Sequence, residues 1–205
     1  MRHSRRFTEL KQKVDRDALL PLDRAVQLVK ENATAKFDES VDIAVRLGID
    51  PKKSDQAVSG TVALPYGTGK QVRVLVFCKG EKQDEARAAG ADFVGFEELV
   101  EKVSSGWTDF DVAVATPDTM SGVGRLGKVL GPKGLMPSPK TQTVTFDIGA
   151  AVKALKAGRI KYRADKTGNV HALVGKVSFE LSKLEANIRT FMNELTHARP
   201  ATAKG

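Results

Sequence analysis

The stretch that most constrains the fold is the run V-R-V-L-V-F at residues 72–77, which is almost continuously apolar. Such a run is typical of a strand in a parallel sheet, because helices cover both faces of that kind of sheet. Helical patterns follow at residues 81–89 and 96–103, and short apolar runs follow at residues 92–94 and 112–115. This alternation of strands and helices with short connections predicts a parallel α/β unit.

The two ends of the chain show a different pattern, that of strands with only one buried face. Apolar and polar side chains alternate over residues 40–47 and again over residues 58–64, so each stretch predicts a half-buried strand. Helical spacing predicts a first helix over residues 5–14 and a second helix that Pro21 introduces. A Ser-x-x-Glu capping box at residues 182–185 predicts a last helix that runs to about His197.

These two patterns predict two domains. The simplest assembly is an α/β domain of residues 67–157, with a Rossmann-like three-layer arrangement, inserted into an α+β domain built from residues 1–66 and 158–205. Both crossings between the domains contain glycine, which makes a hinge plausible there, and paired linkers permit relative motion of domains.

The net charge of +8 is distributed unevenly along the chain. Residues 1–70 carry a net charge of +3, residues 71–158 are neutral, and residues 159–205 carry +5. The positive excess therefore belongs to the two ends, which supports the same division into domains. It also predicts a surface for a polyanion, built from both ends of the chain.

Residues 159–171 concentrate this charge. Arg159, Lys161 and Arg163 occupy every second position, so a strand places all three cations on one face. Residues 165–169 predict a turn and residues 170–174 a returning strand. We interpret the segment as a β-hairpin with a cationic face and a polar tip, which suits a sugar-phosphate backbone better than a small molecule.

Composition excludes several other classes of function. Cys78 is the only cysteine and the three histidines are scattered, so the sequence predicts neither a disulfide nor a zinc site. No convincing pair of acids or nucleophilic motif predicts catalysis or a cofactor. No apolar run approaches the roughly 20 residues of a membrane span, and the basic N-terminus lacks the apolar stretch of a secretory signal. We therefore expect a cytoplasmic protein that does not contact a membrane.

A glycine-rich segment at residues 122–129 fits two nucleotide-binding patterns, G-x-G-x-x-G and G-x-x-x-x-G-K. The second pattern needs Ser or Thr after the lysine to hold Mg²⁺, and Val129 stands there instead. The first pattern should follow its strand directly, but six residues separate it from the strand predicted at residues 112–115. We therefore do not expect nucleotide binding at this segment.

The wider segment of residues 121–140 is basic and contains no acid. It allows two interpretations, a solvated loop or a second contact with RNA, and the sequence does not separate them. The candidate residues for such a contact are Arg125, Lys128, Lys133 and Lys140.

Three other side chains have alternative roles. Phe37 either joins the core or stacks on a base or ribose while Lys36 meets a phosphate. His171 is expected to be structural or to face a phosphate, and not to act in catalysis. Asp165 is expected to order the turn and to orient Lys166 or Arg163.

Several motifs occur in an order that closely resembles the bacterial ribosomal protein L1 family over essentially the whole chain. They are A-T-A-K-F-D-E-S-V at residues 33–41, R-L-G-I-D-P-K-K-S-D-Q at 46–56, S-G-T-V-A-L-P-Y-G-T-G-K at 59–70, L-G-P-K-G-L-M-P-S-P-K at 130–140 and A-G-R-I-K-Y-R-A-D-K-T-G-N-V-H at 157–171. The family usually continues with a strand that carries a T-M-G motif, and Gly205 precedes that strand. If the protein ended at Gly205, we would expect a lower affinity for RNA.

The resemblance implies a structural protein of the large ribosomal subunit. Its implied partners are large-subunit rRNA, the exit-site tRNA, its own messenger RNA and other ribosomal components. It implies that the protein forms a mobile stalk beside the tRNA exit site, helps tRNA release and represses translation of its own messenger. The alternatives are a nucleotide-dependent enzyme, or another regulator that binds structured RNA or DNA.

The resemblance also implies which residues contact rRNA, namely Lys36, Phe37, residues 163–168 and His171. The full predicted rRNA-binding set adds the nearby cations and consists of Lys36, Phe37, Arg46, Lys52, Lys53, Arg159, Lys161, Arg163, Asp165, Lys166, Thr167, Gly168 and His171.

Overall fold

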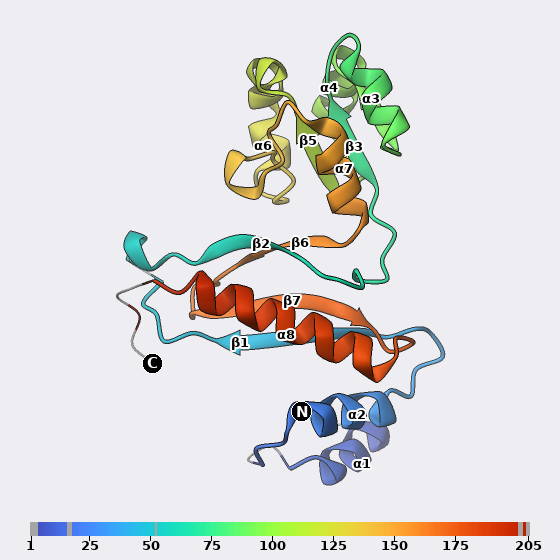
Figure 1. Ribbon diagram of the computed structural model, residues 1–205, viewed down its shortest axis with the longest axis vertical. Coiled ribbons are helices and arrows are strands. Elements are labelled where there is room, and N and C mark those ends of the chain that lie inside the picture. Colours follow the sequence, from blue (N-terminus) through green and yellow to red (C-terminus); the bar gives the residue numbers. More distant parts are fainter. Residues whose placement is uncertain (1–3, 16–17, 52, 201–202, 204–205) are drawn as a thin grey trace.

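The structure is a computed structural model that describes residues 4–15, 18–51, 53–200 and 203. It has three tiers (Figure 1): an α/β unit at one end, a layer of strands with a long helix in the middle, and a pair of helices at the other end. This mixed arrangement of helices and small sheets confirms the predicted fold class.

The α/β unit is built on a parallel sheet of the order β4-β3-β5. Its strands are β3 (Val74–Phe77), β4 (Phe93–Gly95) and β5 (Val112–Ala115). All four residues of β3 are buried, because alternate side chains enter two apolar clusters on opposite faces of the sheet. Helices α3 (Lys82–Ala88) and α7 (Ile148–Lys156) pack on one face, and α4 (Glu97–Ser104) packs on the other. We call residues 72–155 the α/β body.

The basic segment between β5 and α7 is not a loop. It folds into five short helical pieces, η2 (Pro117–Thr119), α5 (Met120–Val123), η3 (Gly124–Leu126), α6 (Gly127–Leu130) and η4 (Pro139–Thr141). The solvated-loop interpretation is therefore wrong, because Val123, Leu126 and Leu130 are fully buried in the core beneath it.

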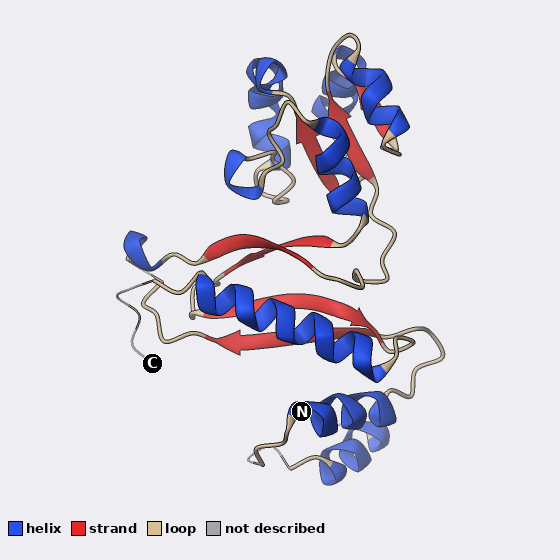
Figure 2. Ribbon diagram, viewed as in Figure 1, coloured by secondary structure: helices blue, strands red, loops and turns tan. Residues whose placement is uncertain are grey.

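The middle tier contains two antiparallel ladders. In one, β1 (Ser40–Arg46) pairs with β7 (Asn169–Lys176); in the other, β2 (Ser59–Ala63) pairs with β6 (Arg159–Arg163). Helix α8 (Leu181–His197) lies along the strands (Figure 2) and covers their apolar face. A short turn of helix, η1 (Ser54–Gln56), joins β1 to β2. We call residues 22–64 and 158–195 the α+β body.

The predicted hairpin between residues 159–163 and 170–174 is wrong in its pairing. A single bridge, between Ala164 and Val170, joins the ends of β6 and β7. Each strand instead forms a full ladder with a partner far away in sequence. Both strands place their apolar side chains on α8, so the alternation in the sequence does not by itself determine which strand pairs with which.

The inner face of the strands follows the predicted alternation. Val58, Val62 and Leu64 are buried, and Tyr162 meets the ring of Phe191 from α8 edge-on at a centroid distance of 5.7 Å. The predicted capping box is wrong, because α8 begins at Leu181 and Glu180 stands at its N-cap without a side-chain cap. Ser182 already lies inside the first turn, so its side chain is past the position that caps a helix.

The remaining helices, α1 (Arg5–Lys13) and α2 (Leu22–Asn32), form the third tier, as their sequence pattern predicts. Val26 of α2 joins the core cluster of Val41, Val174 and Leu184. α1 buries no side chain, and its hydroxyl cap is Ser4, which accepts from the N–H of Phe7.

The two crossings between the bodies pack against each other through glycine. Gly67 has φ +63° and Gly158 has φ +109°, and a Cβ on Gly158 would lie 2.3 Å from the Cα of Gly67. Only glycines allow the two backbones to approach so closely. The domain boundaries at 66/67 and 157/158 stay a prediction, although the four core clusters divide between the two bodies in the same way.

Candidate nucleic-acid interface

The turn between β6 and β7 is ordered by one carboxylate. Oδ1 of Asp165 accepts hydrogen bonds from the N–H of Thr167 at 2.8 Å, the hydroxyl of Thr167 at 2.7 Å and the N–H of Asn169 at 2.9 Å. These bonds, with that from Asn169 the largest cause, lower the pKa of Asp165 to about 2. The carboxylate is therefore a fixed negative charge inside the turn at neutral pH.

A second contact fixes the turn against the loop after β1. Gly168 has φ +81°, and its carbonyl accepts from the N–H of Leu47 at 2.9 Å. A side chain at this position would have a strained backbone, which explains why glycine stands there. The turn is thus held at both its base and its tip, with Lys166 exposed between the two anchors.

The prediction that Asp165 orders the turn is confirmed, but the prediction that it orients Lys166 or Arg163 is not supported by its contacts. The second oxygen of Asp165, Oδ2, lies 3.7 Å from Nε2 of His171 instead. His171 is exposed, whereas Asn169 and Leu173 on the same face of β7 are half-buried. The hydroxyl of Thr167 donates to Asp165 and accepts from Asn169, so its role is to build the turn.

The cations of β6 share one face, as predicted. Lys161 and Arg163 are exposed and Arg159 is half-buried, while Tyr162 between them is buried. The structure adds that two of the three cations contact the α/β body. Nζ of Lys161 donates to the carbonyl of Gly134, and Nη2 of Arg159 donates to Oε1 of Gln142.

These acceptors were not predicted from the sequence. Gln142 is the single described residue other than glycine with a positive φ, at 52°, and nothing in its neighbourhood in the sequence indicates a contact with residue 159. Both acceptors are neutral, and the described ion pairs include no acid beside Arg159 or Lys161. Within the described residues, no ion pair therefore offsets the charge of these two cations at the junction.

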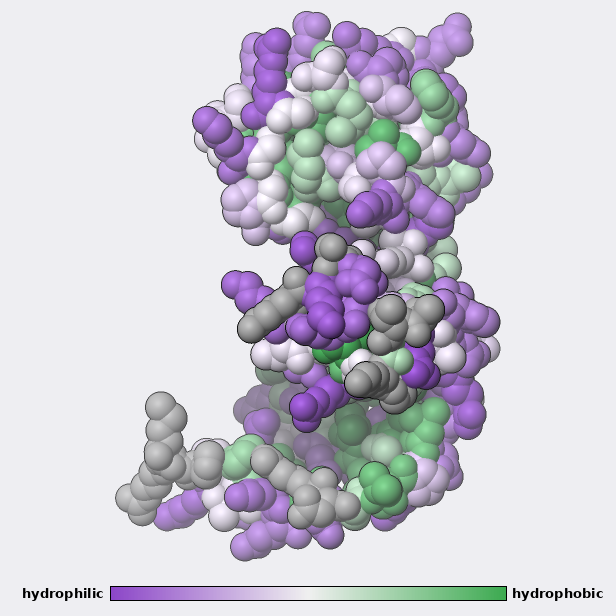
Figure 3. All heavy atoms as spheres, turned by 90° about the vertical axis from the view of Figure 1, so that its left-hand side faces the viewer, coloured by the Kyte–Doolittle hydropathy of each residue, from purple (hydrophilic) through white to green (hydrophobic). Residues whose placement is uncertain are grey.

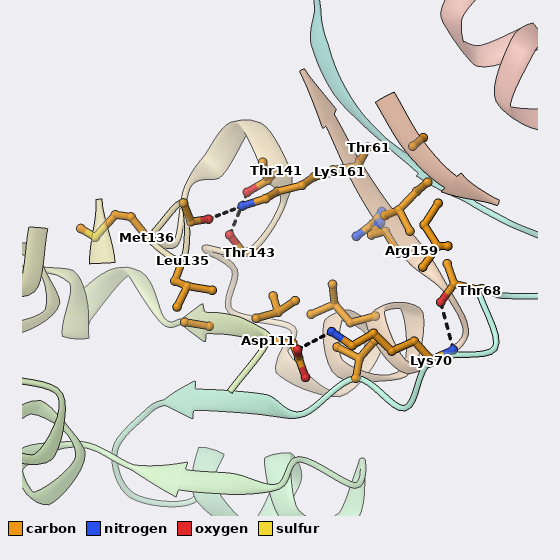
Figure 4. Close-up of a pocket in the computed structure, with 18 of the residues that line it drawn as sticks. Thr61, Thr68, Lys70, Asp111, Leu135, Met136, Thr141, Thr143, Arg159 and Lys161 are labelled. Atoms are coloured by element: carbon orange, nitrogen blue, oxygen red, sulfur yellow. Dashed lines mark hydrogen bonds and ion pairs between the residues drawn. The ribbon is translucent and has the colours of Figure 1, made fainter. Parts of the chain in front are cut away.

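A cavity of about 290 Å³ opens beside these contacts, between β6, β7 and the α/β body. Its walls are largely apolar and include Leu135, Met136 and Ile160, and Lys70 reaches Asp111 across one side at 2.6 Å (Figure 4). His171 and Lys161 both line it, so this part of the open face of the strands lies beside the α/β body.

Lys36 and Phe37 lie at the other end of the strands. In the register of β1 and β7, Ser40 opposes Lys176 while Arg46 opposes Asn169, so the β6–β7 turn is next to Arg46. Six strand steps of about 3.3 Å separate the two ends by roughly 20 Å. The predicted set is therefore a strip along the strands, and not one compact patch.

The segment of Phe37 is tied to the end of β7. Asp38 accepts from the N–H of Ser178 at 3.1 Å and from its hydroxyl at 2.8 Å. Phe37 is 74% exposed, so the interpretation of Phe37 as a core residue is wrong. Its ring is available for stacking, and Lys36 beside it is exposed as well.

Other cations of the predicted rRNA-binding set lie at the end of β1 and in the loop after it. Arg46 is exposed at the end of β1, and Lys53 is exposed in the loop that follows. Lys52 lies outside the described residues. Figure 3 views this end of the molecule, where hydrophilic side chains gather over the middle tier and apolar ones lie lower, toward α1 and α2.

The second candidate group, on the α/β body, does not form one cluster. Arg125 and Lys128 are exposed on η3 and α6, while Lys133 donates to the hydroxyl of Thr108 at 2.6 Å. Lys140 is exposed on η4, two residues before Gln142. The nucleotide-binding patterns in this segment do not form a phosphate loop, because Gly124 and Gly127 have helical φ values of −56° and −53°.

Other chemistry finds little support in the part of the chain that the structure describes. Within those residues, no group of three or more His, Cys, Asp or Glu side chains could hold a metal ion. Burial raises the pKa of the Cys78 thiol to about 11, so this cysteine is not poised as a nucleophile. Among the described helices, none is long and apolar enough to cross a membrane.

Known proteins of one family are similar to this chain over nearly its whole length. The model of the ribosomal protein L1p/L10e family matches residues 29–205. The large ribosomal subunit protein uL1 of Kosmotoga olearia is 53% identical over 204 residues, which cover 100% of this chain and 88% of the relative. The proteins of the same name from Bordetella pertussis and Bordetella parapertussis are each 58% identical over 202 residues, covering 98% of this chain and 87% of each relative.

Proposed function

Because the chain belongs to the ribosomal protein L1p/L10e family, we propose that the open face of its strands, with the β6–β7 turn at one end and Phe37 at the other, is its rRNA-binding surface. The protein is a structural constituent of the large ribosomal subunit and not an enzyme. Large-subunit rRNA and other components of that subunit are therefore its partners, and the ribosome in the cytoplasm is its location.

The observation that carries the proposed site is the double anchoring of the β6–β7 turn. Asp165 and the Leu47–Gly168 hydrogen bond hold the turn before any ligand arrives. A pre-ordered contact loses less conformational entropy on binding than a flexible one does. Lys166 projects from this fixed turn, and Arg163 stands three positions before it at the end of β6, so both cations are placed for phosphate groups.

We propose a different role for each part of the strip. Lys36, Arg46, Lys53, Arg163 and Lys166 neutralise phosphates, and Phe37 stacks on an unpaired base or a ribose. Arg159 and Lys161 contribute positive potential at the junction with the α/β body. The turn is built by Asp165, Thr167 and Gly168. The exposed imidazole of His171 donates a hydrogen bond to the RNA.

A filter-binding experiment with an rRNA fragment tests this surface. We expect the variants Arg163→Ala and Lys166→Ala to bind more weakly, and each to lower the slope of log affinity against log salt by about one unit. Lys102→Ala is the matched control, since Lys102 is an exposed lysine on α4 of the α/β body and not on the strip. Unchanged affinity and slope in both site variants would remove the turn from the interface.

Three finer proposals follow from membership of this family. We propose that the protein forms the mobile stalk beside the exit site and helps tRNA release, with the cations of residues 125–140 nearest to that tRNA. We propose that it represses translation by binding its own messenger RNA through the same strip. Competition between the rRNA fragment and the messenger leader tests the shared site, since each RNA should displace the other.

The alternative partner is duplex DNA. An RNA partner is favoured because the strip offers an exposed aromatic ring for unpaired bases, and the 2′-hydroxyl distinguishes RNA from DNA. Structured RNA should therefore displace duplex DNA from the protein at equal phosphate concentration. The reverse order of competition would favour the DNA-binding alternative.

A further inference from the structure

One polar side chain lies deep in the core of the α+β body. Asn187 of α8 is 0% exposed, although its neighbours Leu184, Ile188 and Phe191 on the same face of the helix are apolar. A buried carboxamide is costly unless its hydrogen bonds are satisfied. Its presence in this core therefore requires a specific set of partners.

Those partners are all backbone groups of two other segments. Oδ1 of Asn187 accepts from the N–H of Tyr66 at 3.2 Å, and Nδ2 donates to the carbonyls of Gly67 at 2.9 Å and Val174 at 2.8 Å. Val174 belongs to β7, and Tyr66 and Gly67 form the first crossing between the bodies. One side chain thus joins the crossing to both α8 and β7.

The first crossing in turn fixes the second. Gly67 packs on Gly158 with no space for a Cβ, and the N–H of Leu64 donates to the carbonyl of Gly158 at 3.4 Å. Gly158 leads directly into β6, where Arg159 and Lys161 contact Gln142 and Gly134 of the α/β body. The bonds of Asn187 are therefore the first link in a continuous set of contacts that ends at the junction of the two bodies.

We propose that Asn187 is a positioning residue, which sets where the α/β body sits over the cationic strand β6 by holding the crossing at Tyr66 and Gly67. The proposal rests on the geometry of the crossing and does not depend on the proposed function. A carboxamide suits this role because it can accept from one backbone N–H and donate to two carbonyls at once.

Distance measurement between the bodies tests the proposal. Spin labels are placed on the exposed positions Lys128→Cys and Ser182→Cys in a Cys78→Ala background, and pulsed electron paramagnetic resonance gives the distance distribution. We expect Asn187→Ala to shift and broaden this distribution, because Tyr66 and Gly67 lose their partners. Asn193→Ala is the matched control, an exposed asparagine on the same helix that should leave the distribution unchanged.

A second variant keeps the test decisive if Asn187→Ala does not fold. Gly158→Ala places a Cβ 2.3 Å from the Cα of Gly67, so it pushes the crossings apart without touching α8. Gly158→Ala should therefore shift the distribution of distances between the two spin labels, as Asn187→Ala does. An unchanged distribution in folded Asn187→Ala, or in Gly158→Ala where the first variant is unfolded, would overturn the proposal. A loss of stability alone, with the distance unchanged, would give Asn187 a structural role only and would equally overturn it.

Discussion

The Oδ1 atom of Asp165 lies 2.9 Å from the backbone nitrogen of Asn169, and this hydrogen bond closes the turn between β6 and β7. The ionised carboxylate accepts this bond more strongly than the protonated form does, and the bond contributes most to lowering the pKa of Asp165 to about 2. A carboxylate with a depressed pKa stabilises the fold above its unfolded pKa, and this contribution disappears as the pH falls through the folded value.

The order of the turn should therefore be lost between about pH 4 and pH 2. The amide protons of Thr167 and Asn169 report it, because their hydrogen exchange and chemical shifts depend on the bonds to Asp165. In Asp165→Asn the same protons should lack this titration. A titration that persists in the variant would assign the effect to another group.

Phe37 provides a test of stacking that is separate from stability. Its side chain is 74% exposed, so Phe37→Ala should leave the melting temperature unchanged. Base stacking on an aromatic ring is worth about 1–3 kcal/mol, so the affinity for the rRNA fragment should fall by roughly 5-fold to 150-fold. Phe146→Ala is the matched control, since Phe146 is 64% exposed on the α/β body. Equal losses in both variants would argue against a specific role for Phe37.

Lys166 and Lys161 should differ in their importance for RNA binding. Lys161 donates to the carbonyl of Gly134, whereas the Lys166 ammonium makes no hydrogen bond or ion pair with another described residue. Lys166 can meet a phosphate without giving up an existing contact. Lys166→Ala should consequently lower the affinity more than Lys161→Ala, as measured by titration at one salt concentration. The opposite ranking would place the RNA nearer to the junction of the bodies.

Substitution of two glycines by alanine should have different effects on the free energy of unfolding. Gly168 has φ +81°, a conformation that strains any other residue, so Gly168→Ala should lower the free energy of unfolding by about 1 kcal/mol or more. Gly124 has a helical φ of −56° and open space around a Cβ. Gly124→Ala should be neutral or stabilise by about 0.5–1 kcal/mol, because alanine favours helix. Chemical denaturation measures both, and a large loss in Gly124→Ala would contradict its helical role.

Phe191 tests the core beneath the strands. Its ring is fully buried and meets Tyr162 of β6 edge-on, so it couples α8 to the cationic strand. Phe191→Ala should reduce the free energy of unfolding by about 3–5 kcal/mol through the cavity it leaves. Its neighbour Met192 is 37% exposed, and Met192→Ala should change stability by only about 0.5 kcal/mol. Urea titration followed by circular dichroism compares the two.

Predictions from the sequence were most accurate for elements whose structure depends on residues close together in the chain. The apolar run at β3, the alternation at β1 and the helical spacing of α8 each reflect a local periodicity that burial imposes on every strand or helix. The carboxylate of Asp165 was predicted to order its turn for the same reason, because its partners lie within four residues. The capping box at Ser182 failed because Glu180, two residues earlier, already occupies the N-cap and the helix begins at Leu181.

Predictions that needed a partner from elsewhere in the chain were weaker. The segment of β6 and β7 was predicted as a hairpin, although β2 and β1 are the real partners. The basic segment at residues 121–140 allowed a loop, because its buried residues Val123, Leu126 and Leu130 stand among glycines, prolines and cations. Whether Phe37 was buried also depended on what packs beside it, and the folded chain leaves 74% of it exposed.

The sequence by itself determined the two kinds of strand, the positive excess at both ends of the chain, and the family to which the motifs belong. Only the tertiary structure decided that the predicted RNA contacts form a strip about 20 Å long, that Arg159 and Lys161 meet the α/β body, and that Asn187 holds the crossing. The reason is physical: periodicity and charge are properties of neighbouring residues. A hydrogen bond between residues 120 positions apart depends on how the whole chain packs.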